Sequence, residues 1–146
     1  MRALTLWQPW AQFAVTGAKR VETRGWPTKV RGEIAIHAAK RRPDASIALD
    51  PGAAYSEICA QLAGAGMLPL GAVVGTVEIV DCLPIEALYG TEYDTELERA
   101  RGDWSAGRYG WLLKNPVRFD APAAANGHQG FWRWDGPICS PGTKNS

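Results

Sequence analysis

The sequence predicts an α+β fold in which five to six short strands build a small mixed β-barrel flanked by two or three helices. The apolar stretches are short and rich in β-branched residues, and glycines and prolines stand at their ends. Few segments have helical spacing, so a small barrel fits better than a doubly wound sheet. We expect one domain over residues 1–135 and a flexible, polar tail over residues 136–146.

The N-terminal quarter predicts a strand, a helix and a second extended segment. Residues 2–7 are short and apolar, and Pro9 suits the first turn of a helix that ends at Gly17. Residues 20–26 combine charged and β-branched side chains, and Pro27 prevents their continuing as a central strand. We expect these residues to form an edge strand or an extended loop.

The rest of the chain alternates strands with turn-rich segments. Strands are expected at 33–38, 71–83, 109–119 and 130–134, the third bent at Asn115-Pro116 and the last closing the barrel. Residues 33–38 alternate as in a half-buried strand, with His37 facing away from the isoleucines. A loop is expected at 41–52, a helix at 53–65, and at most one short helix between 84 and 107.

Composition excludes several classes of protein. The apolar fraction of 46% and the lack of a long apolar segment argue against disorder, secretion and membrane insertion, so we expect a cytoplasmic protein that is most simply a monomer. Because the net charge is only +1, any electrostatic binding of nucleic acid must come from a local basic patch. The three cysteines and two histidines lack metal-ligand spacing, and no phosphate-binding loop or nucleophile elbow is present. We therefore expect no cofactor.

The segment 17–24 is the main candidate site. In an extended chain Glu22 and Arg24 lie on the same side, close to Lys19. Such a cluster is either a solvated row of ion pairs on an edge strand or the floor of a polar cleft. Glu78 favours the cleft, because a carboxylate within an apolar strand needs a partner, and Lys19 or Arg24 could provide one.

Other residues could extend such a site. His37 and Lys40 belong to a basic stretch that either contacts phosphates or forms a solvated loop. The seven tryptophans could all belong to the core, which is the default for large aromatic side chains, and any beyond the needs of the core could supply stacking faces. The full set of candidate ligand-binding residues is Trp10, Lys19, Glu22, Arg24, Trp26, His37, Lys40, Trp111 and Lys114.

Several motifs together resemble the ASCH domain family. They are Leu4-Thr5-Leu6-Trp7-Gln8-Pro9-Trp10-Ala11, Gly17-Ala18-Lys19-Arg20-Val21-Glu22-Thr23-Arg24, the segments 75–82 and 109–116, and Gln129-Gly130-Phe131-Trp132. The resemblance spans residues 2–134 and implies a PUA-like β-barrel, a fold of RNA-binding and modified-base-reading domains. It also implies a cleft at the Gly-Xaa-Lys-Xaa-Xaa-Glu-Xaa-Arg segment.

The resemblance implies two classes of function. The first is the binding of RNA, DNA or a modified nucleobase through a polar cleft with aromatic walls. The second is a small hydrolase acting on acetylated cytidine or on RNA, for which Lys19, Glu22 and Glu78 would be catalytic and a divalent metal would be needed only by a ribonuclease. The amidohydrolase branch has a threonine where this chain has Glu22, so water would have to act as the nucleophile.

Overall fold

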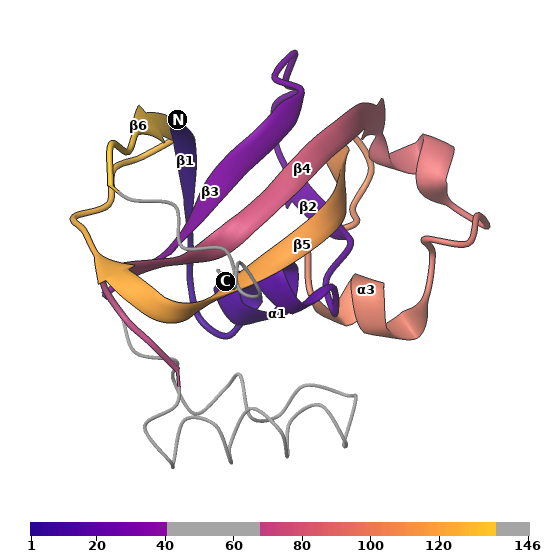
Figure 1. Ribbon diagram of the computed structural model, residues 1–146. Coiled ribbons are helices and arrows are strands. Elements are labelled where there is room, and N and C mark those ends of the chain that lie inside the picture. The colour runs from indigo at the N-terminus through magenta and orange to yellow at the C-terminus, as the bar shows by residue number, and fades with distance from the viewer. Residues whose placement is uncertain (41–67, 137–146) are drawn as a thin grey trace.

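The computed structural model describes residues 1–40 and 68–136, in which six strands form one strongly curved sheet (Figure 1). The strands are β1 (Arg2–Leu6), β2 (Val21–Arg24), β3 (Gly32–Ala38), β4 (Ala72–Pro84), β5 (Tyr109–Ala124) and β6 (Phe131–Arg133). Their order in the sheet is β2-β5-β4-β3-β1-β6. Among the strand pairs of the described residues, only β1 and β3 run parallel. The predicted α+β fold with a small mixed barrel is confirmed.

The hydrogen-bonded ladder stays open, which corrects the expectation that the last strand closes the barrel. β6 pairs with β1, whereas β2 lies at the opposite edge and pairs with β5. Both edge strands are short, four residues in β2 and three in β6, which limits the unpaired backbone at each edge. The expectation of an edge strand near residues 20–26 is confirmed.

Helix α1 (Trp10–Thr16) packs against the concave side of the sheet and ends beside the candidate site. The Gln8 side chain accepts a hydrogen bond of 2.9 Å from the backbone N–H of Gln12 and so caps the first turn. The helix ends at Gly17, whose φ of 84° lies in the left-handed region that glycine tolerates best. The backbone N–H of Lys19 then donates to the carbonyl of Phe13 at 2.9 Å, which fixes the turn into β2.

The two long strands β4 and β5 carry the bend expected at Asn115-Pro116. Thr76 pairs with Val117 and Glu78 with Lys114, so Val77 faces two residues on β5. Asn115 has a φ of 50° there. β5 runs on to Ala124 instead of ending at Phe119.

Residues 84–107 contain two short helical segments where one was expected: the 3-10 helix η2 (Ile85–Leu88) and α3 (Glu96–Ala100). The Thr95 hydroxyl caps α3 by accepting from the backbone N–H of Glu98 at 3.1 Å. The loop and helix expected at 41–52 and 53–65 lie outside the described residues. So does nearly all of the expected tail.

The main core lies between α1 and the concave face of the sheet. Ile34, Ile36 and Ala38 of β3 join it together with Trp111, and this confirms their predicted common face. The opposite face of β3 is also covered near its end, because Ala35 packs with Phe119 and Trp134. The prediction of a half-buried strand is therefore wrong for this half of β3, where His37 is 1% exposed.

Candidate functional site

A cleft of about 520 Å³ opens where the end of β1, the start of α1 and strand β2 meet. Its walls include Trp7, Trp10, Glu22, Arg24, Trp26 and Arg108. Four of these residues, Trp10, Glu22, Arg24 and Trp26, were predicted from the sequence. The cleft thus brings together the motif before α1 and the charged motif after it.

The pairing of β2 with β5 decides which side chains reach the cleft. Glu22 lies opposite Trp111, and alternation along β2 turns Glu22 and Arg24 to the same side. Thr23 also borders the cleft, but alternation turns its side chain the other way, and its hydroxyl accepts a hydrogen bond of 3.0 Å from the backbone N–H of Asp103. This agrees with the expectation that Thr23 does not replace the threonine of the amidohydrolase branch.

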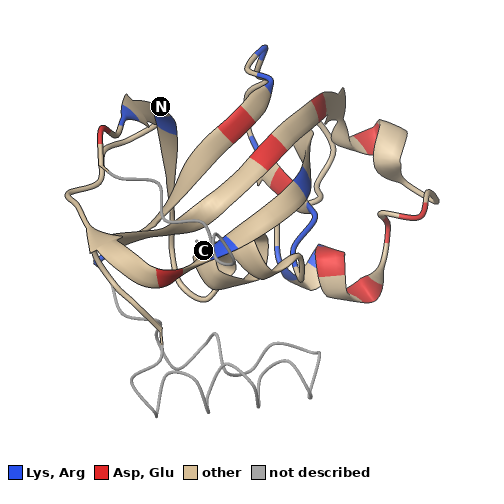
Figure 2. Ribbon diagram, viewed as in Figure 1, with Lys and Arg blue, Asp and Glu red and all other residues tan. Residues whose placement is uncertain are grey.

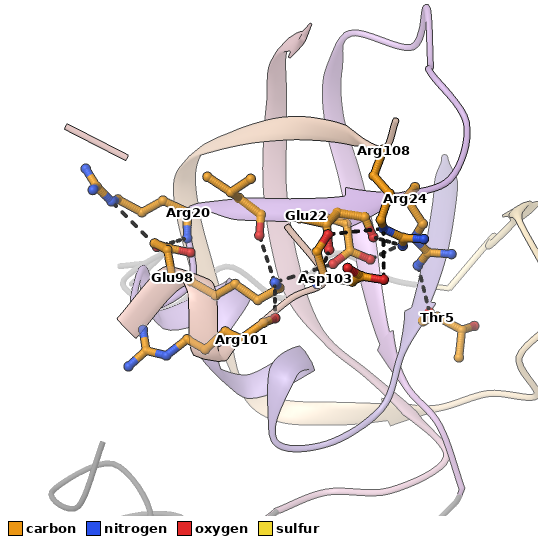
Figure 3. A network of polar contacts seen from close by, with 11 residues as sticks. Thr5, Arg20, Glu22, Arg24, Glu98, Arg101, Asp103 and Arg108 are labelled. Atoms are coloured by element: carbon orange, nitrogen blue, oxygen red, sulfur yellow. Dashed lines mark hydrogen bonds and ion pairs between the residues drawn. The ribbon is translucent and has the colours of Figure 1, made fainter. Parts of the chain in front are cut away.

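Glu22 forms a nearly buried carboxylate between two cations (Figure 3). Its Oε2 atom accepts from Arg24 Nε at 2.8 Å, and its Oε1 atom lies 3.6 Å from Lys19 Nζ. The predicted cluster of three charges is confirmed. Because each carboxylate oxygen has two acceptor positions, Glu22 can still accept hydrogen bonds from a molecule in the cleft.

Lys19 approaches the Glu22 carboxylate from the protein interior and does not line the cleft. It is 1% exposed, and its ammonium donates to the carbonyls of Val21 at 2.7 Å and Arg101 at 2.8 Å. Burial lowers the pKa of Lys19, while the nearby Glu22 and Glu98 carboxylates act in the opposite direction. Two of the three ammonium protons are thus donated to backbone carbonyls, and the Glu22 carboxylate lies at ion-pair distance.

The segment around α3 anchors Lys19 and the start of β2. Glu98, which is 3% exposed, accepts from the backbone N–H of Arg20 at 2.9 Å and lies 3.8 Å from Arg20 Nε. The carbonyl of Arg101 follows directly after α3 and binds Lys19. The base of the cleft therefore depends on a segment that is far from it in the sequence.

Two tryptophans expose flat faces at the cleft. Trp7 is 52% exposed and Trp26 is 50% exposed, and the Arg24 guanidinium lies 5.5 Å from the Trp26 ring centre. Trp111 was expected to be a stacking wall, but it is fully buried and belongs to the core. It supports Trp26 instead, because its indole N–H donates to the Trp26 carbonyl at 3.3 Å and the two rings meet edge to face.

Glu78 and Lys114 lie away from the cleft, which corrects the expected pairing of Glu78 with Lys19 or Arg24. Glu78 accepts a hydrogen bond of 2.6 Å from the Asn115 side chain and pairs in register with Lys114. Neighbouring Val77 faces the core, so alternation turns Glu78 to the outer face of the sheet. Lys114 is exposed and borders a separate, smaller cavity.

His37 and Lys40 line a second cavity, of about 380 Å³. The imidazole Nε2 of His37 lies 2.7 Å from the Ala125 carbonyl, which can only accept, so this nitrogen carries the proton. Nδ1 then accepts from the Thr5 hydroxyl at 3.2 Å, and that hydroxyl accepts from the Trp132 indole at 3.0 Å. Burial lowers the pKa of His37, which favours this neutral ring.

Five cleft residues were not predicted from the sequence: Thr5, Leu6, Trp7, Thr23 and Arg108. Trp7 is part of the first motif and stands close before the helix, so it could have been included. Arg108 reaches the cleft only because Arg24 pairs with Tyr109 across β2 and β5. Strand order could not be derived from the sequence, so no signal identified Arg108.

Within residues 1–40 and 68–136, no group of three or more His, Cys, Asp or Glu side chains is arranged to hold a metal ion. In the same part of the chain, no helix is long and apolar enough to cross a membrane.

Known proteins are similar to this chain in sequence and in fold. Activating signal cointegrator 1 is 29% identical in mouse and 28% identical in human over 136 residues, which cover 92% of this chain and 22% of each relative. The chain thus spans about a fifth of the length of these relatives. The crystal structure of ASCH from Zymomonas mobilis superposes with a TM-score of 0.51 at 20% identity, over 84% of this chain and 72% of that one.

A tyrosine-to-phenylalanine mutant of the same Zymomonas mobilis protein superposes with a TM-score of 0.50, over 84% of this chain and 74% of that one, also at 20% identity. These likenesses show the fold. The ASCH domain model matches residues 4–123, from β1 through nearly all of β5, and the chain therefore belongs to the ASCH domain family.

Proposed function

We propose that the cleft binds an unpaired base of RNA or DNA, or a modified nucleobase. One observation carries this proposal: two half-exposed tryptophans and a nearly buried carboxylate line the same cleft. Aromatic faces stack on bases, and side chains read the hydrogen-bonding edge of a base that has left its helix. Membership of the ASCH family supports the same class of ligand.

The polar wall of the cleft favours one kind of base edge. Glu22 presents acceptors only, so it favours a base edge that bears amino or imino N–H groups. Arg24 and Lys19 flank this carboxylate and hold it in one orientation. Arg108 stands at the rim, where its guanidinium donates to the carbonyls of Asp103 and Thr23 and adds positive charge beside the floor.

The geometry gives no specific support to hydrolysis. Glu78 is bound to Asn115 and lies away from Lys19, the Lys19 ammonium is buried and bonded to two backbone carbonyls, and Glu22 replaces the threonine. The hydrolase alternative therefore stays a prediction, and so does the divalent metal that a ribonuclease would need.

Replacing Trp26 with alanine tests the binding proposal. Stacking on an aromatic side chain contributes about 1–3 kcal/mol per base, so Trp26→Ala is expected to weaken binding of a short single strand by roughly five- to a hundredfold. The Trp26 carbonyl that accepts from Trp111 is kept in the variant, which limits the effect on folding. Fluorescence anisotropy with a labelled mixed-sequence strand at low salt measures the change.

Leu97→Ala is the matched control, because Leu97 is a 45% exposed apolar side chain on α3 that does not line the cleft. It should bind the strand as the unmodified protein does. If neither RNA nor DNA binds at low salt, or if Trp26→Ala binds as tightly as Leu97→Ala, the proposal is wrong.

A further inference from the structure

The second cavity lies directly beside the cleft, and Thr5 lines both. The backbone carbonyl of Thr5 accepts from Arg24 of the cleft at 3.5 Å. Its hydroxyl belongs to the hydrogen-bonded chain between Trp132 and His37 in the second cavity. A ligand that occupies both the cleft and the second cavity therefore has to pass only one residue of β1, which is Thr5.

The lining of the second cavity is positively charged. Among the described residues around it are Lys40 and His128, and none is Asp or Glu. The cleft differs in this respect, since Glu22 lies in its floor. The acidic residues between 86 and 98 gather around η2 and α3, away from β1 and β6 (Figure 2). The field in the second cavity thus favours an anion.

Lys40 is held in place and keeps free donors. Its ammonium donates to the Asn126 side chain at 3.0 Å, and its stem lies against Gly71, where an added Cβ would come within 2.9 Å of Lys40 Cγ. The other two ammonium protons have no acceptor among the described residues. The backbone N–H groups of residues 126–129 likewise have no intramolecular partner among them.

His37 fixes the shape of this cavity and does not offer a nitrogen to a ligand. Both of its ring nitrogens are used, by Ala125 and by Thr5. Gly127 packs so closely that an added Cβ would lie 2.6 Å from the His37 ring and 2.8 Å from the Thr5 hydroxyl. The loop that carries His128 is therefore packed against His37, and Asn126 of the same loop binds the Lys40 ammonium.

We propose that this second cavity is a phosphate subsite, which holds the phosphate next to the base bound in the cleft. The inference rests on the proposed function and deepens it, because it makes the ligand a nucleotide or a strand rather than a free base. Lys40 and the backbone N–H groups of the 126–129 loop donate to the phosphate oxygens, as in other anion sites built from backbone amides.

The test compares ligands that differ only in phosphate. The four ribonucleosides, their 3′- and 5′-monophosphates and a mixed-sequence six-nucleotide strand are titrated against the unmodified protein, Lys40→Gln and Arg2→Gln. Arg2 is a matched control, because it is an exposed cation on β1 that lines a different cavity with Arg133. Monophosphates separate a terminal phosphate from the phosphodiester of the strand.

A monophosphate is expected to bind roughly tenfold more tightly than its nucleoside, and Lys40→Gln should abolish this gain while leaving nucleoside affinity unchanged. With the strand, Lys40→Gln should also lower the slope of log K against log salt by roughly one. Arg2→Gln should do neither. If nucleosides are too weak to measure, the strand titration decides by the same comparison.

The phosphate subsite is overturned if a monophosphate gains nothing over its nucleoside, if the gain survives in Lys40→Gln, or if the strand shows the same salt slope in Lys40→Gln and the unmodified protein. In each of these cases strand binding that depends on Trp26 would leave the proposed function standing. If no strand binds, both proposals fail together.

Discussion

Replacing Lys19 with methionine is expected to lower the free energy of unfolding by about 3 kcal/mol, because removing one partner of a buried pair leaves the others unsatisfied. In this protein the partners are the carbonyls of Val21 and Arg101 and one oxygen of Glu22. Arg24 still pairs with Glu22, which keeps the loss below the cost of a fully stranded carboxylate. Urea unfolding followed by tryptophan fluorescence measures it.

Two further readouts sharpen this test. Lys114→Met removes an exposed lysine from β5, and its free energy of unfolding should change by less than about 0.5 kcal/mol. Burial lowers the pKa of Lys19 below its usual 10.5, so between the lowered value and 10.5 the unfolded chain binds more protons and stability rises with pH. The advantage of the unmodified protein over Lys19→Met should therefore grow with pH in that window. Equal stability of the Lys19→Met and Lys114→Met variants would contradict this role of Lys19.

Gly75→Ala is expected to cost at least about 3 kcal/mol of unfolding free energy, since the side chain has no space and the obstacle is backbone. A Cβ at Gly75 would lie 2.0 Å from the Val117 carbonyl oxygen and 2.9 Å from the Val15 side chain. Relief would require β4 to separate from β5, or α1 to move off the sheet. Thermal unfolding followed by circular dichroism should show a large drop in the midpoint.

Gly25→Ala is the control for this change, because a Cβ there meets only the Arg108 side chain at 3.7 Å, an ordinary contact. Its midpoint should stay near that of the unmodified protein. If Gly75→Ala unfolds at the same temperature as Gly25→Ala, the close packing of α1, β4 and β5 described above is wrong.

The strands could be predicted where the chain itself limits them. Pro27 and Pro84 follow β2 and end β4, and Asn115-Pro116 marks the bulge in β5. The order of the strands depends on contacts between distant residues, which a local pattern does not contain. The edge position of β6, which was expected to close the barrel, was missed for this reason.

Only part of the candidate site could be predicted, because the rest also depends on contacts between distant residues. The local spacing of Lys19, Glu22 and Arg24 on one short segment was enough to predict their cluster, and the structure confirms it. Glu78 has its hydrogen-bond partner at the bulge in β5, where the Asn115 side chain turns toward it. The sequence predicted the bulge but not the direction of this side chain. Trp111 looks like a stacking residue in sequence, but contacts with residues distant in the chain bury it in the core.

The central claim is that the cleft between Trp7 and Glu22 receives a base. Its most direct test is a titration of the ¹⁵N-labelled protein with a short single strand, followed through the seven tryptophan indole N–H signals. We predict shifts for Trp7, Trp10 and Trp26, which line the cleft, and none for Trp104, which is buried near η2. Binding that leaves the three cleft signals in place while others shift would contradict the account.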